Sequence, residues 1–143
     1  MQVAFYDIAQ VADEEITFVV MVSRYQGEWI LVRHQERTTW EIPGGHREAD
    51  ETLEVAARRE LFEETGAAEF GLYPVGIYSV SSDGRTSYGK LYFAEVKTLG
   101  RLPEFEIAEI ILRSDFPQNN LTYPLIQPLL YEKVVDCLKL ETR

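Results

Sequence analysis

The sequence predicts an α/β domain built on a mixed β-sheet. Segments with the pattern of β-strands precede, separate and follow two segments with the pattern of α-helices, which is the order expected for layers of sheet and helix. The chain has 143 residues, of which 45% are hydrophobic, so it can bury one substantial core. We therefore expect residues 1–143 to form a single domain.

The first predicted pair of elements is a β-hairpin. Residues 16–22 are rich in β-branched side chains, residues 25–28 have turn composition, and residues 29–33 return as the second strand. Beyond a polar loop lie paired glycines, Gly44 and Gly45, whose small size lets the backbone come close to a ligand.

A helix is expected from Thr52, as its N-cap, to about Thr65, with Gly66 as its stop. Its apolar residues fall on two sides: Leu53, Ala57 and Leu61 on one, and Val55 and Phe62 on the other. We therefore expect the core to cover this helix on both sides of its glutamate face. Only Glu54, Arg58 and Thr65 are then expected in solvent.

The second half of the chain predicts further strands and a second helix. The strands are expected at residues 70–80, 88–96 and 107–112, with a turn-rich loop at 81–87 and irregular chain at 97–105. The second helix is expected from Pro124 to about Leu140. Because Pro128 lacks a backbone N–H, a start of the continuous helix at that residue is the alternative.

Three glutamates share one face of the first predicted helix. Glu60, Glu63 and Glu64 stand at positions i, i+3 and i+4, so their carboxylates project into one small volume. Each adjacent like-charged pair destabilises a helix by roughly 0.2–0.5 kcal/mol, so a partly buried cluster needs a positive charge. Clustered oxygen ligands suit a hard divalent cation, Mg²⁺ or Mn²⁺. The alternative is an ordinary solvated glutamate face.

The charged residues and glycines around this helix follow the spacing of a known family. The matching positions are Gly45, Glu51, Arg59, Glu60, Glu63, Glu64 and Gly66. At every one of them the chain resembles the Nudix hydrolases, and it departs from the pattern only at Ala67, where the family usually has Ile, Leu or Val. The resemblance implies the Nudix fold, in which a mixed β-sheet is sandwiched between α-helices.

The resemblance also implies which residues bind metal. Glu60, Glu63 and Glu64 match metal ligands, with Glu63 and Glu64 the strongest candidates. The carbonyl of Gly44 is a further candidate ligand. The implied cofactor is Mg²⁺, with Mn²⁺ as a substitute, and the dependence on metal is expected to be absolute.

Other residues are expected to support the chemistry. Arg59 matches an arginine that orients neighbouring carboxylates, and Glu51 matches either a supporting group or an occasional metal ligand. Family members often take one more carboxylate from a loop beyond the motif, as a ligand or general base. Glu106 is our candidate for that role, with Glu104 and Glu109 as alternatives, and an exposed loop glutamate is the simpler interpretation.

Residues outside the motif are candidates for substrate contacts. Those that could contact phosphates, or be ordinary surface, are Arg33, His34, Arg37 and Lys90. Trp40 is expected either to stack on a base or to pack in the core. Residues 115–120 resemble a segment of MutT-type sanitising enzymes in which an asparagine reads the edge of oxidised guanine. The counterpart here is Asn120, and an Asn-rich turn is the alternative.

Composition limits the partners. The formal charge of −10 disfavours long nucleic acids, whose binding depends on Lys and Arg, but it allows a small nucleotide bridged by cations. The lone Cys137 is expected to be a packed thiol in a reducing compartment. With neither a signal-peptide pattern nor a membrane-length apolar run, the sequence predicts a cytoplasmic protein, and it leaves monomer and homodimer open.

The predicted function is therefore Mg²⁺-dependent pyrophosphohydrolysis of a nucleoside diphosphate linked to another group. The favoured substrate is a nucleoside triphosphate, including an oxidised one such as 8-oxo-dGTP, cleaved to a monophosphate and pyrophosphate. The alternatives within enzymes are nucleotide sugars, dinucleoside polyphosphates and capped RNA ends. The alternatives outside enzymes are a catalytically silent nucleotide sensor and an interaction domain that docks through its acidic helix.

Overall fold

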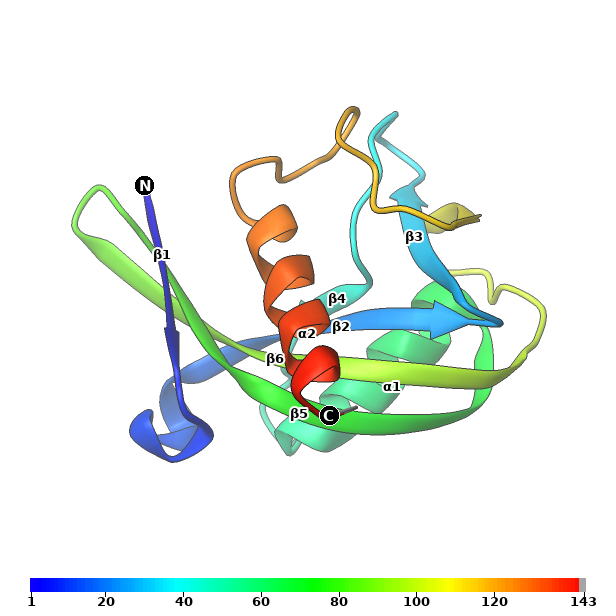
Figure 1. Ribbon diagram of the computed structural model, residues 1–143. Helices are drawn as coiled ribbons and strands as arrows, with labels where there is room; N and C mark the ends of the chain where they lie inside the picture. Colours follow the sequence, from blue (N-terminus) through cyan, green and yellow to red (C-terminus); the bar gives the residue numbers. More distant parts are fainter. Residues whose placement is uncertain (142–143) are drawn as a thin grey trace.

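The computed structural model describes residues 1–141 (Figure 1). Its seven-stranded mixed sheet has the order β1-β5-β6-β2-β3-β7, with β4 paired beside β2. Strands β2 and β6 are parallel, and the other pairs are antiparallel. The strands are β1 (Gln2–Tyr6), β2 (Ile16–Tyr25), β3 (Glu28–His34), β4 (Gly44–His46), β5 (Ala67–Ser82), β6 (Arg85–Leu99) and β7 (Ile107–Arg113). The helices are α1 (Leu53–Thr65) and α2 (Gln127–Glu141), with short 3₁₀ turns at 8–10 and 13–15.

The two helices cover opposite faces of the sheet (Figure 1). Successive side chains of a strand point to opposite faces, so Val19 and Met21 of β2 pack in the core layer that contains Leu61 of α1. Val20 of the same strand packs in the other layer, which contains Leu130 of α2. This arrangement confirms the expected mixed sheet sandwiched between helices.

The predicted β2–β3 hairpin is confirmed, and the β5–β6 hairpin is tighter than expected. Its strands are joined directly at Asp83 and Gly84, whose φ angles are 53° and 77°. Positive φ at both central residues of a two-residue turn matches the twist of the paired strands. The polar residues on either side, Ser82 and Arg85, therefore continue the pairing of β5 with β6. The loop expected at 81–87 is therefore wrong. Strand β1, which pairs with β5, was not predicted at all.

Helix α1 begins and ends as predicted, because its capping residues have specific chemistry. The Thr52 hydroxyl accepts a hydrogen bond from the Val55 N–H over 3.1 Å. Gly66 adopts the left-handed region with φ 80°, and its N–H donates to the Phe62 carbonyl over 2.8 Å. A Cβ at Gly66 would also lie 2.5 Å from the Arg101 carbonyl oxygen, so the helix exit requires glycine.

The expectation that core covers α1 on two sides is wrong. Val55 and Phe62 are 50% and 48% exposed, because the helix lies on the sheet along the single face that carries Leu53 and Leu61. Thr65, expected in solvent, is fully buried, and its hydroxyl is satisfied by donating to the Leu61 carbonyl over 2.6 Å.

Helix α2 begins at Gln127, with Pro128 in its first turn, where a missing N–H leaves no helical hydrogen bond unmade. The alternative prediction, in which the second helix begins at Pro128, is thus confirmed to within one residue. Cys137 is half-buried and free on this helix. Within residues 1–141, neither helix is long and apolar enough to cross a membrane.

Candidate active site

The paired glycines bring β4 against both its neighbouring strand and α1. A Cβ at Gly44 would lie 2.6 Å from the Val19 carbonyl oxygen, and a Cβ at Gly45 would overlap the Glu60 carboxyl group. The Gly44 N–H donates to Glu64 Oε1 over 2.9 Å. The close approach expected of these glycines is therefore an approach to the helix glutamates themselves.

Arg59 is the centre of the charge network on α1. It binds Glu51 through two hydrogen bonds, Nε to Oε2 at 2.5 Å and Nη2 to Oε1 at 2.8 Å. Its Nη1 donates to Glu60 Oε1 over 2.7 Å and lies 3.4 Å from Glu63 Oε1. The bonds from Arg59 lower the pKa of Glu51 to about 2, so this carboxylate stays ionised. Arg59 thereby hydrogen-bonds three of the motif glutamates, which is the geometry that its predicted orienting role requires.

Glu64 lies deepest in the cluster. It is 6% exposed, and burial raises its pKa to about 8, against the opposing effect of the Gly44 N–H. The nearby charges of Glu60 and Glu41 contribute to the same rise. Burial also raises the pKa of Glu60, although Arg59 opposes this. The site thus holds more negative charge than Arg59 balances, and it favours either a proton or a cation.

The cluster opens into a cleft of about 120 Å³ lined by Glu60, Glu63, Glu64, Phe105 and Glu106. Glu106 reaches this cleft from the loop before β7, and that loop is fastened at two points. The Gln35 N–H donates to the Glu106 carbonyl over 2.9 Å, and Gln35 Nε2 donates to the Phe105 carbonyl over 3.0 Å. Glu104 does not line the cleft, and Glu109 is paired with Arg33 over 3.0 Å.

The donor chemistry of the cleft fits a hard divalent cation. Four carboxylates face one small space, and carboxylate oxygens are the protein ligands that Mg²⁺ and Mn²⁺ prefer. Among the described residues, no three acidic, histidine or cysteine side chains already converge as a finished coordination sphere. Glu60 is turned toward Arg59 instead. Metal binding at this site would therefore require small side-chain movements.

His34 and Glu41 connect the acidic cleft to its surroundings. His34 Nε2 lies 3.7 Å from both Glu41 Oε1 and Glu64 Oε2, and its Nδ1 lies 3.8 Å from Glu106 Oε2. Glu41 is 7% exposed and accepts a hydrogen bond from Arg37 Nη1 over 3.1 Å. Of the four proposed phosphate contacts, the structure therefore places His34 and Arg37 beside the cleft. Glu41 was missed, although an acidic residue between Trp40 and Ile42 was a detectable signal.

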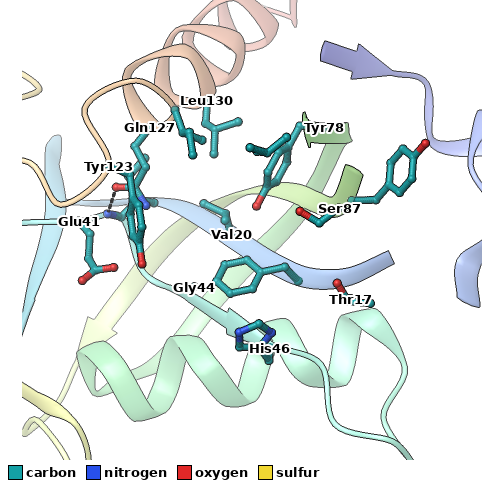
Figure 2. A pocket seen from close by; sticks show the side chains of 15 residues that line it. Thr17, Val20, Glu41, Gly44, His46, Tyr78, Ser87, Tyr123, Gln127 and Leu130 are labelled. Atoms are coloured by element: carbon teal, nitrogen blue, oxygen red, sulfur yellow. Dashed lines mark hydrogen bonds between the residues drawn. The ribbon is translucent and has the colours of Figure 1, made fainter. Parts of the chain in front are cut away.

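A second cavity, of about 260 Å³, lies on the other side of β4 (Figure 2). Its walls are contributed by β2, β4, β5, β6 and the start of α2, and five of its side chains are aromatic: Phe18, His46, Tyr78, Tyr88 and Tyr123. Gly44 lines this cavity while its N–H binds Glu64 in the cleft. A single strand thus separates an aromatic cavity from an acidic cleft.

The remaining proposed substrate residues lie outside both spaces. Arg33 is engaged by Glu109 and by the carbonyl of Arg37, 3.0 Å from its Nη1. Lys90 lies over the ring of Tyr92, with 5.2 Å between its Nζ and the ring centroid. Neither Arg33 nor Lys90 lines the cleft or the cavity.

Trp40 and Asn120 are joined to each other through the backbone. The Trp40 N–H donates to the Asn120 carbonyl over 2.7 Å, and the half-buried Trp40 ring packs against the α2-side core. Asn120 is exposed, with φ 59°, a conformation that Asn tolerates in turns. Neither side chain lines the aromatic cavity, so base recognition by them stays a prediction.

Comparison with known proteins agrees with this arrangement. The model of the NUDIX domain matches residues 13–122. The chain is 35% identical over 102 residues to YtkD of Bacillus subtilis, a candidate 8-oxo-dGTP diphosphatase, covering 71% of this chain and 64% of YtkD. It is 33% identical over 78 residues to the phosphatase NudJ of Escherichia coli, covering 53% of this chain and 51% of NudJ. The matches thus span between half and two thirds of the length of these two curated relatives.

A solved structure extends the likeness over most of the fold. The pyrophosphohydrolase BsRppH of Bacillus subtilis, in a mutant form, superposes with a TM-score of 0.80 and 27% identity, covering 94% of this chain and 90% of that one. A NUDIX hydrolase from Nitrosomonas europaea shares the fold, with a TM-score of 0.66, 23% identity and coverage of 87% and 89%. Because the domain model matches well over half of the chain, the protein belongs to the NUDIX domain family.

Proposed function

We propose that this chain is a Mg²⁺-dependent pyrophosphohydrolase that cleaves a nucleoside diphosphate linked to another group. The favoured substrate is a nucleoside triphosphate, including an oxidised one such as 8-oxo-dGTP, which yields a nucleoside monophosphate and pyrophosphate. The observation that carries the proposal is the position of Gly44 between an acidic cleft and an aromatic cavity. A nucleotide has the two matching ends, a charged polyphosphate and a flat base.

The cofactor is assigned to the acidic cleft. Glu60, Glu63 and Glu64, together with the Gly44 carbonyl, are the proposed ligands of Mg²⁺ or Mn²⁺. When bound there, the cation neutralises the phosphate charge and lowers the pKa of a bound water. The residues present support this role because Glu64 would release its proton as positive charge arrives.

The surrounding residues of the chain hold this set in place. Arg59 fixes Glu51 and Glu60 through charge-assisted hydrogen bonds, so the carboxylates need little reorganisation when substrate binds. Glu106 is the proposed additional carboxylate, acting as general base or further ligand, because it faces the cleft from the loop that Gln35 fastens. Arg37 and His34 are proposed to meet the phosphates at the edge of the cleft.

The names of the relatives support the reaction class. YtkD carries the name of a candidate 8-oxo-dGTP diphosphatase, NudJ that of a phosphatase, and BsRppH that of a pyrophosphohydrolase. All three names describe cleavage of phosphate bonds. Small nucleotides are accordingly the proposed partners of this chain.

One experiment tests the proposal and separates its rivals. The protein is incubated with Mg²⁺ and a panel of nucleoside triphosphates, 8-oxo-dGTP, nucleotide sugars, dinucleoside polyphosphates and a capped RNA, and the products are separated by chromatography. We expect monophosphate and pyrophosphate from at least one triphosphate, and no product when EDTA replaces Mg²⁺. Turnover of only a rival class would reassign the substrate. Binding without turnover would identify a nucleotide sensor.

A further inference from the structure

The Gln127 side chain presents a pair of hydrogen-bond donors to the aromatic cavity. Gln127 is 5% exposed at the start of α2, and it lines the cavity (Figure 2). The Ile42 N–H donates to Gln127 Oε1 over 2.7 Å. Because an N–H must face an acceptor, this bond fixes which end of the amide is oxygen. The Nε2 group is therefore at the opposite end, and within residues 1–141 no acceptor binds it.

Tyr78 supplies a second unsatisfied polar group to the same cavity. It is 6% exposed, and its hydroxyl forms no hydrogen bond with the described residues. Gly89 leaves room for its ring, since a Cβ there would overlap the ring atoms. In Figure 2 the ring points from β5 into the pocket, with its oxygen toward Val20. Burial raises the pKa of this phenol, so it remains a neutral donor and acceptor.

Two side chains that are each more than nine-tenths buried present unpartnered polar groups to one cavity, which indicates a ligand. Buried polar groups in folded proteins are nearly always hydrogen-bonded, and leaving a donor unpaired is unfavourable. Four of the other lining side chains, Phe18, His46, Tyr88 and Tyr123, are aromatic, which suits a flat ring. At about 260 Å³ the cavity is also small for a ligand pocket, so it admits one ring system and its sugar.

We propose that Gln127 determines base specificity by selecting bases carrying a carbonyl group over bases carrying an amino group at the same position, and that Tyr78 hydrogen-bonds the same base. The amide nitrogen only donates. The edge of guanine or hypoxanthine offers adjacent N7 and O6 acceptors, whereas that of adenine places an amino donor beside N7. Tyr78 can donate or accept, so it adds affinity. The inference rests on the proposed function, because it assumes that a nucleotide occupies this site.

Inosine and adenosine nucleotides are the matched probes, since their bases differ in this region mainly by oxygen or nitrogen at C6 and by the proton on N1. The variant Gln127→Glu keeps an acceptor for the Ile42 N–H and replaces the donors with an oxygen. We expect kcat/KM of the parent with Mg²⁺ to be about tenfold or more higher for ITP than for ATP. In Gln127→Glu this ratio should fall at least about tenfold. The control Gln118→Glu adds the same charge on an exposed loop outside the cavity and should leave the ratio unchanged.

The outcomes separate this inference from the proposed function. A parent ratio near one, or an unchanged ratio in folded Gln127→Glu, overturns the inference and leaves the hydrolase intact. If Gln127→Glu does not fold, Tyr78→Phe decides, because loss of its hydroxyl should lower kcat/KM for ITP at least about fivefold. An unchanged kcat/KM in Tyr78→Phe then overturns the inference.

If the protein hydrolyses no triphosphate, the proposed function is overturned, but the inference can still be tested by a binding measurement. Calorimetry with IMP and AMP then tests the inference alone. Tighter binding of IMP than of AMP by the parent upholds it if the difference is lost in Gln127→Glu or, where that variant does not fold, if IMP binding is weakened in Tyr78→Phe. Equal affinities for IMP and AMP, or no binding of either, reject it.

Discussion

The Gly44 N–H donates a 2.9 Å hydrogen bond to Glu64, the most buried carboxylate of α1. This bond links strand β4, which lines the aromatic cavity, to the helix that carries the acidic cleft. A substrate lying across β4 would therefore meet both parts of the site at fixed separation. Positioning of this kind contributes to catalysis, because the reacting groups lose little further translational and rotational freedom in reaching the transition state.

Removing a carboxylate from the cleft should impair turnover while the fold survives. We expect Glu63→Gln and Glu64→Gln each to lower kcat by on the order of 10²-fold or more, because a lost metal ligand removes several kcal/mol of transition-state stabilisation. The matched control is Glu54→Gln, on the same helix but with 67% of its side chain exposed. Activity within threefold of the parent in both cleft variants would reject their assignment as ligands.

Mg²⁺ should raise the melting temperature in the absence of substrate. The carboxylates of the cleft come together only in the folded chain, so a cation that binds there stabilises the folded state by mass action. We expect an increase of several degrees at millimolar Mg²⁺, measured by calorimetry, and a smaller one in Glu64→Gln. The same increase in parent and variant would place the cation elsewhere.

The pH dependence of stability without metal should carry the signature of Glu64. Its pKa is raised from the ordinary 4.5 to about 8, so between these values the folded protein holds a proton that the unfolded chain has released. The contribution of this group to stability is therefore present below pH 4.5 and is lost as the pH rises toward 8. In EDTA, the difference in melting temperature between parent and Glu64→Gln should change by several degrees from pH 5 to pH 8. A constant difference would contradict the raised pKa.

Arg59→Lys should weaken catalysis through the carboxylates that Arg59 holds. Lysine cannot form the two parallel bonds to Glu51 while also reaching Glu60, so we expect activity to fall roughly 10–100-fold.

The same substitution should also change the acid stability. The pKa of Glu51, lowered from 4.5 to about 2 by Arg59, implies stability that is present above pH 4.5 and lost on acidification. The variant should therefore unfold at a higher pH during acid titration. The control is Arg58→Lys, because Arg58 lies on the same helix and its exposed side chain pairs with Glu54 outside the cleft.

The acidic motif could be predicted from the sequence because its members lie within one helix and the turns beside it. Helical spacing fixes which face Glu60, Glu63 and Glu64 share, and the caps at Thr52 and Gly66 follow from local chemistry. Burial was harder to predict. An apolar pair such as Val55 and Phe62 fits a buried stripe as well as an exposed one, and only the packing of α1 on the sheet decides between them.

The aromatic cavity could not be predicted in the same way, because distant segments build it. Tyr78 comes from β5, Tyr123 from the chain before α2, and Gln127 from its first turn. Their proximity depends on the order of strands in the sheet, which local patterns do not specify. Glu41 differs, since its contacts with Arg37 and His34 are made within one loop and its place between Trp40 and Ile42 was a detectable signal.

Asn120 is the residue that the MutT-like segment singles out as a reader of oxidised guanine. The structure gives it an exposed side chain outside the cavity, a left-handed backbone with φ 59°, and a carbonyl that accepts the Trp40 N–H. These features are typical of a turn residue, so we expect Asn120→Ala to reduce stability by about 1 kcal/mol through strain at positive φ. Asn120→Gly, which tolerates that conformation, should restore the stability. The ratio of kcat/KM for 8-oxo-dGTP over dGTP should be the same in the parent and in both variants. A selective loss of the 8-oxo-dGTP reaction in Asn120→Ala and Asn120→Gly alike would instead establish Asn120 as the base reader, and it would mean that the loop moves toward the cavity when substrate binds.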